Sequence, residues 1–250
     1  MLLDRKAIKA QAKGIVKSAR VSAYTFTLVY LLIIMALMVL NNLFGTENTV
    51  DPEIQLQLRQ MGLVMIDLPH LITVPASIAA FITLVVGFAQ TVFGCGYILY
   101  HLGVRRGKEM PFSTLTDGFT FAGKAILLGV VMEIFIFLWT LLFIIPGIIA
   151  SYRYRYAFMN LCENPDIGIM DAIRMSKVQT AGYKWQLFVV DLSFLGWIIL
   201  SAFTAGILLI WVEPYIVQTN VGCFQVCKKA SGVGSFPTEN PGDNFQSWNV

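Results

Sequence analysis

The chain has 250 residues, of which 56% are hydrophobic and only 13% are charged, and its mean hydropathy is +0.68. An average soluble domain is about a quarter charged, so a soluble fold of this composition would lack the polar surface to cover itself. The formal net charge of +3 is too small to indicate a nucleic-acid-binding protein. The composition therefore predicts an all-α, polytopic transmembrane helix bundle with the lipid bilayer as its partner.

The first residues form a basic amphipathic pattern. Leu3 and Ile8 fall on one side of a helix, whereas Lys9, Lys13 and Lys17 recur every four residues on the other. We expect an interfacial helix over residues 1–20 that lies in the headgroup plane, where each cation near an anionic surface contributes about 1 kcal/mol. The alternative is that these cations only orient the first span.

Long apolar runs predict about six membrane spans, since a spanning helix needs roughly 20 mostly apolar residues. Pro146 and Gly147 break one run, and Gly206 breaks another, so both positions are expected to be hairpin turns. The expected spans cover residues 21–44, 77–100, 125–145, 148–162, 186–205 and 207–227.

The connections between the spans predict the orientation. Lys and Arg precede the first span and follow the second, fourth and sixth, whereas the outer loop, residues 45–75, is mainly acidic. Short cytoplasmic loops collect basic residues, so both termini are expected in the cytoplasm. Four spans would also satisfy this rule if the stretches 125–162 and 186–227 were re-entrant. Within the outer loop, Pro52 is expected to open an amphipathic helix.

The bundle is expected to occupy residues 1–229. Residues 230–250 are rich in Gly, Pro, Ser and Asn with no apolar period, so they are predicted to be a disordered cytoplasmic tail.

Five ionisable residues lie inside expected spans. A charge at the bilayer centre costs about 2.5–3.5 kcal/mol on insertion scales, so such residues should face the interior and pair. Their depths suggest that Arg153 pairs with Glu213 and that Arg155 reaches Glu133. The set either holds the hairpins in register or lines a polar path for a solute, an ion or a proton. It comprises Glu133, Arg153, Arg155, Asp191 and Glu213.

The two C-terminal hairpins resemble each other in sequence. The first has Trp139, Gly147, Ile148, Tyr152 and Tyr156, and the second has Trp197, Gly206, Ile207, Trp211 and Tyr215 at nearly the same spacing. An amphipathic segment precedes each hairpin, and the N-terminal helix with the first span gives a third such unit. This pattern predicts a bundle of three related units.

Recognisable catalytic or metal-binding patterns are not found in the sequence. His70 and His101 lie far apart, and Cys223 and Cys227 lack further ligands nearby. No HExxH, phosphate loop or nucleophile elbow occurs. We therefore expect a protein that is not an enzyme and has no cofactor.

Several motifs in the second half occur in a characteristic order. They are LWTLLFIIPGII from Leu138, YRY from Tyr152, ENPD from Glu163, DAIRMSK from Asp171, LSFLGW from Leu192, and Pro214-Tyr215. This stretch resembles the bacterial integral membrane family known as domain of unknown function 975. The resemblance implies a multi-pass protein of the bacterial plasma membrane but no activity. A more distant similarity to the membrane regions of glycerophosphodiesterases suggests an accessory role near lipid metabolism.

Two functional hypotheses follow. The first is a non-catalytic membrane organiser or accessory protein that acts on another membrane protein or on lipid, including anionic headgroups. The second is a small transporter or channel with a polar path through the five charged residues, since transporters often combine repeats with broken helices.

Overall fold

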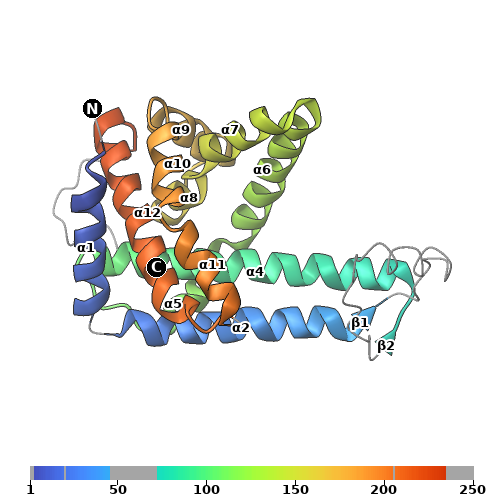
Figure 1. Ribbon diagram of the computed structural model, residues 1–250. Helices are drawn as coiled ribbons and strands as arrows, with labels where there is room; N and C mark the ends of the chain where they lie inside the picture. The colour runs from blue at the N-terminus through green and yellow to red at the C-terminus, as the bar shows by residue number, and fades with distance from the viewer. Residues whose placement is uncertain (1–2, 20, 46–71, 205, 235–250) are drawn as a thin grey trace. The chain divides into compact units, whose positions relative to one another are not determined.

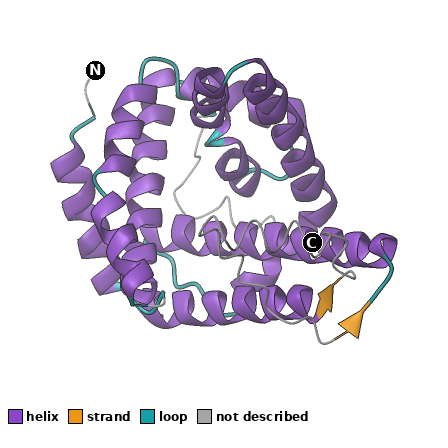
Figure 2. Ribbon diagram, turned by 45° about the vertical axis from the view of Figure 1, so that its right-hand side comes forward, coloured by secondary structure: helices purple, strands orange, loops and turns teal. Residues whose placement is uncertain are grey.

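The computed structural model is almost entirely helical in the residues that it describes, which are 3–19, 21–45, 72–204 and 206–234 (Figures 1 and 2). The expected outer-loop helix and most of the predicted tail lie outside these residues. In chain order the elements are α1 Arg5–Ser18, α2 Ala23–Leu43, β1 Phe44–Gly45, β2 Ile72–Thr73, α4 Ala76–Arg105, α5 Thr114–Asp117, the 3-10 helix η1 Gly118–Phe121, α6 Ala122–Leu142, α7 Ile144–Tyr154, α8 Ala157–Glu163, α9 Ile169–Gln179, α10 Lys184–Leu192, α11 Leu195–Phe203 and α12 Leu209–Ser231.

Four stretches of these helices are long and apolar enough to cross a membrane, counting only the described residues. They are Ala23–Leu43, Ala76–Arg105, Thr114–Leu142 and Lys184–Phe203. Their surfaces carry large apolar side chains that water would not tolerate, such as Phe81, Phe137 and Phe203. The all-α class and the membrane-embedded character predicted from composition are thus confirmed.

The chain divides into two compact units, one of residues 29–91 and one of residues 1–28 with 92–250. In the smaller unit, Thr83 of α4 donates a hydrogen bond of 3.0 Å to Asn41 of α2. Strands β1 and β2 pair in parallel there, with Phe44 opposite Ile72. The functional features described below all lie in the larger unit.

Helices α6, α7 and α8 form a hairpin in which the outgoing leg is one helix, α6, and the return leg is broken into two, α7 and α8. The turn is the single extended residue Phe143, and α7 then packs along α6. Pro146 and Gly147, which were expected to make the turn, lie instead in the first turns of α7. Proline is tolerated there because the first amides of a helix have no intrahelical acceptor, and Gly147 lets α7 approach Thr140 closely.

The last hairpin has its break in the outgoing leg. Helices α10 and α11 are separated at Ser193 and Phe194, and α12 returns as one helix despite Pro214. Gly206 lies in the connecting turn with φ +83°, a conformation that favours glycine. The two hairpins therefore differ at the matched pair Gly147 and Gly206, since the first is helical and the second makes the turn.

Each helical segment that precedes a hairpin packs on a different hairpin. Helix α5 and η1 contact α4, where a Cβ on Gly96 would overlap the backbone of Leu115. Helix α9 packs on α7 and α8, and α1 packs along α12 (Figure 1). The three predicted units are consequently interlocked rather than independent.

The apolar face of α1 is covered by protein. Ile8, Ala12 and Val16 are buried, and the ammonium of Lys9 lies 4.0 Å from the ring centre of Phe194. Burial, followed by repulsion from Arg5, lowers the pKa of Lys9. The face expected to enter the headgroup layer is therefore used to hold α1 on the last hairpin. This differs from the expectation because an apolar stripe has the same sequence pattern whether lipid or protein covers it.

Candidate functional site

An ion pair at the helix break between α7 and α8 links the last two hairpins. The guanidinium of Arg155 binds both carboxylate oxygens of Asp191 in α10 and donates to Asn220 of α12 at 2.8 Å. Tyr152 donates a further hydrogen bond of 2.8 Å to Asp191. A bidentate pair of this kind fixes direction as well as distance, so α7, α10 and α12 are held in one register.

Helix α9 caps the same break. The hydroxyl of Ser176 donates to the carbonyl of Arg153 at 2.9 Å and accepts from the amide of Tyr156 at 3.1 Å. Thr180 also donates to the Arg153 carbonyl, at 3.3 Å. Backbone groups freed at a helix break must find partners when they are buried, and α9 supplies them. Its inner face is therefore partly polar and packs in the bundle.

A reciprocal amide pair fixes α9 to α8. Asn160 and Gln179 exchange two hydrogen bonds of 2.9 Å, and their side chains are 1% and 0% exposed. Each amide thus satisfies the other in a place that water does not reach.

Glu163 joins the C-terminal ends of three helices. It lies at the end of α8, and its carboxylate forms ion pairs with Arg106, directly after α4, and with Lys228, near the end of α12. The Glu163 side chain is only 7% exposed, so the pairs are shielded from solvent on the carboxylate side. The returning legs of all three hairpins therefore end together.

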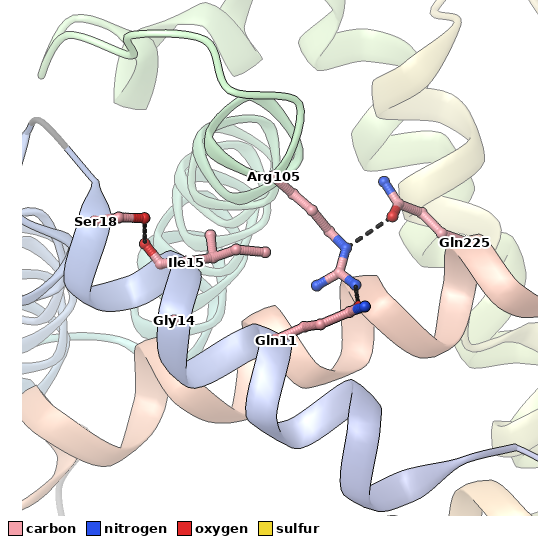
Figure 3. A pocket seen from close by; sticks show the side chains of 6 residues that line it. All are labelled: Gln11, Gly14, Ile15, Ser18, Arg105 and Gln225. Atoms are coloured by element: carbon pink, nitrogen blue, oxygen red, sulfur yellow. Dashed lines mark hydrogen bonds between the residues drawn. The ribbon is translucent and has the colours of Figure 1, made fainter.

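Arg105 occupies the last turn of α4 and faces α1 and α12 (Figure 3). Its guanidinium donates to the side chain of Gln225 at 2.7 Å, to the backbone of Gln218 at 3.2 Å and to the side chain of Gln11 at 3.3 Å. These three acceptors are neutral. Among the described residues, Arg105 forms no ion pair with a carboxylate.

A buried histidine lies one turn earlier in α4. The side chain of Gln218 is 3.0 Å from Nδ1 of His101 and donates to the His101 carbonyl at 2.9 Å. The rings of Tyr97 and Tyr100 meet the imidazole edge to face. His101 is fully buried, and Gln218 contacts both its Nδ1 atom and its carbonyl.

The structure brings together only part of the predicted charge network. Arg155 pairs with Asp191, so the expected pair of Arg155 with Glu133 is wrong. Glu133 lies exposed on α6, and Arg153 and Glu213 are half-buried. No ion pair joins Arg153 to Glu213 in the part of the chain that the structure describes.

Several residues of the polar interior escaped the sequence analysis. Glu163 was placed only in a family motif, and the amides and hydroxyls that complete the network carry no charge. One signal was available, since uncharged polar residues within apolar segments usually need a partner. It would have indicated Asn160, Gln218 and Asn220, which lie within expected spans, but not Ser176 and Gln179, which lie in the polar segment between two spans.

The four cysteines Cys95, Cys162, Cys223 and Cys227 are reduced and buried. No group of three or more His, Cys, Asp or Glu side chains suited to a metal ion occurs among the described residues. The cysteines are therefore packing residues in this structure.

Comparison with known proteins identifies one stretch of the chain. Residues 140–229 match the family described as "Protein of unknown function (DUF975)", which confirms the resemblance seen in the sequence motifs. No curated protein and no solved structure matches the chain. The matched stretch contains α7 to α11 and most of α12, and hence Arg155, Asp191, Asn220 and Glu163. The similarity to glycerophosphodiesterase membrane regions stays a prediction.

Proposed function

We propose that this chain, which carries the DUF975 region, is a non-catalytic, six-span protein of the bacterial plasma membrane. It organises or assists a partner protein or lipid, and both of its termini lie in the cytoplasm. The observation that carries the proposal is the joining of the three returning legs at Glu163. That contact supports a scaffold whose hairpins are fixed to one another at one end.

The hairpin geometry supports six crossings over four. Helix α6 has 21 residues, about 31 Å at 1.5 Å per residue, which is enough to cross the hydrocarbon core. Since the turn at Phe143 is a single residue, α7 and α8 must run back beside α6. Lys124 near the start of α6 donates to the carbonyl of Pro165 at 2.6 Å, so the return leg ends beside the start of the hairpin. The return leg of the last hairpin is α12, whose end meets Glu163 through Lys228.

The side of the membrane follows from the charges at the joined ends. Arg105, Arg106, Lys228 and Lys229 lie there, and short loops rich in such residues stay in the cytoplasm. The glutamate contact and the positive-inside rule thus support the same orientation.

The polar interior supports a structural role because its members bind one another. Arg155, Asp191, Tyr152 and Asn220 form one hydrogen-bonded group, and Asn160 with Gln179 forms another. A transport path needs polar groups that exchange protein partners for a solute or water. The charges of Arg155 and Asp191 neutralise each other, so this group offers a solute no unpaired charge.

An exchange of charges tests the scaffold. The double variant Arg155→Asp with Asp191→Arg should recover most of the stability that either single variant loses, because the pair still forms. The matched control is the same exchange at Asp171 and Arg174, an exposed pair whose side chains are 60% and 73% accessible. That control should change the unfolding midpoint little. Recovery of stability combined with lost biological activity of the double variant would contradict a purely structural pair.

A transporter is the second candidate, favoured by the three charged residues that lack ion-pair partners among the described residues. Glu133 is exposed halfway along α6, and Glu213 and Arg153 are half-buried. Purified protein in sealed vesicles distinguishes the two functions. The scaffold proposal expects no ion or solute flux above protein-free vesicles. Flux that Glu133→Gln or Glu213→Gln removes, while the Asp171 and Arg174 exchange leaves it intact, would establish the transporter and reject the scaffold.

A further inference from the structure

The proposed scaffold function gives no role to a pocket beside Arg105. It is a shallow hollow, widely open at the surface, with a volume of about 590 Å³, and it is lined by Gln11, Gly14, Ile15, Ser18, Arg105 and Gln225 (Figure 3). The lining comes from one flank of α1, the end of α4 and the last turns of α12. This flank of α1 is separate from its buried face, which carries Ile8, Ala12 and Val16.

The pocket combines a cation with hydrogen-bond donors. Arg105 gives it a positive charge that no described carboxylate neutralises. The amide oxygens of Gln11 and Gln225 accept from the guanidinium, so the amide nitrogens of both side chains remain as donors. Such a lining suits a ligand that carries negative charge and accepts several hydrogen bonds.

The guanidinium is held in place before any ligand arrives. Three oxygens fix its orientation, and Gly222 of α12 allows it to approach closely. A Cβ on Gly222 would come within 2.9 Å of Nη2 of Arg105 and within 2.8 Å of Ile8. A preorganised guanidinium loses less side-chain freedom when it binds an oxyanion.

We infer that this pocket binds a phosphate group. The phosphate has two sources in the cell, namely the headgroup of an anionic lipid in the cytoplasmic leaflet and a soluble phosphate compound. Arg105 ends a helix that is long and apolar enough to span a membrane, beside the joined basic ends, and the end of such a span is the depth at which lipid phosphates lie. The inference deepens the proposed function, because it gives the scaffold a ligand, and it rests on the proposed cytoplasmic orientation only for the source of the phosphate.

The test uses the full chain purified in detergent and three probes. Phosphatidylglycerol carries the phosphate on a lipid, diacylglycerol with the same acyl chains lacks it, and inorganic phosphate lacks the lipid. Bound lipid is counted by native mass spectrometry, and inorganic phosphate is titrated by calorimetry. We expect phosphatidylglycerol to bind and diacylglycerol not to bind. Binding of inorganic phosphate without phosphatidylglycerol would assign the soluble source, whereas equal binding of both lipids, or no binding of either phosphate probe, would overturn the inference.

Two kinds of variant locate the site. Arg105→Gln should weaken binding about tenfold or more, since it removes charge-assisted hydrogen bonds. The control Lys229→Gln removes one positive charge from the same basic ends, at an exposed residue outside the pocket lining. An equal loss in both variants would mean that only general charge attracts the probe, and the inference would fail.

A pocket-filling variant covers the case in which Arg105→Gln does not fold. Gly14 lines the pocket and has open space around it, so Gly14→Phe should block the ligand without disturbing the fold. Gly14→Ala should leave binding unchanged. Wild-type affinity in folded Gly14→Phe would place the ligand elsewhere and refute the site. Because these measurements need neither a partner nor a vesicle, their failure is distinguishable from failure of the scaffold proposal.

Discussion

Substitution of the Asn160 and Gln179 amides should show strong coupling between α8 and α9. Gln179→Leu leaves the side-chain oxygen of Asn160 without its partner and leaves its nitrogen only the carbonyl of Ala172, at 3.5 Å. An orphaned buried polar group costs about 1–3 kcal/mol. Asn160→Leu should also be destabilising, because the side-chain oxygen of Gln179 loses its partner, although the nitrogen keeps the carbonyl of Val233, at 3.3 Å.

The double variant should be less destabilised than the sum of the two single variants. Once both amides are apolar, no polar group is left unpaired, and replacement of both partners is often nearly neutral. Coupling energies for hydrogen bonds in membrane proteins average about 0.6 kcal/mol and reach about 1.7 kcal/mol. With two bonds and almost complete burial, we expect about 1–2 kcal/mol.

Equilibrium unfolding in mixed micelles, followed by tryptophan fluorescence, measures all four proteins of this cycle. An equivalent cycle at the exposed pair Asp171 and Arg174 serves as the control and should give no more than about 0.5 kcal/mol. If the Asn160 and Gln179 effects add within about 0.5 kcal/mol, α9 is not fixed to α8 by these bonds. The packing of α9 within the bundle would then be refuted.

Three further outcomes test the hairpins. Gly96→Ala should destabilise the protein by about 1–3 kcal/mol, because its Cβ overlaps the backbone of α5, whereas Gly87→Ala on the same helix has open space and should be neutral or stabilising by thermal unfolding. Gly206→Ala should cost about 1–2 kcal/mol at φ +83°, and an unchanged unfolding midpoint would contradict that turn. Cysteines introduced at Lys108 and Lys184 should react with a membrane-impermeant thiol reagent only when the reagent can reach the cytoplasmic face. Labelling of the two cysteines from opposite faces would reject the six-span arrangement.

Hydropathy predicted the membrane class and much of the helical layout because a bilayer demands long apolar helices with satisfied backbones. It could not predict the turn at Phe143. Pro146 is a strong helix breaker in sequence, yet it is acceptable near a helix start, so the break and the proline need not coincide.

The charge partners were beyond sequence reasoning for a different physical reason. Arg153 and Glu213 were paired by expected depth alone, but contact also requires that both side chains point toward each other around their helix axes. The break at Arg155 and Tyr156 and the break at Ser193 and Phe194 each interrupt a helix. The rotation of the chain beyond such a break cannot be counted from residue spacing. Asp191, just before the second break, is thus the partner of Arg155.

The one-residue connection at Phe143 has a consequence for biogenesis. In the proposed six-span arrangement, a linker this short would not let α6 cross the membrane while α7 and α8 remain in water, so the three helices would have to insert together. The apolar residues at this turn are strongly exposed, with exposed fractions of 69–73% for Leu141, Phe143, Ile144 and Ile145. They would be the first residues of this hairpin to enter the lipid. A nascent chain that stalls before Glu163 emerges would lack the carboxylate that pairs this hairpin with Arg106 and Lys228.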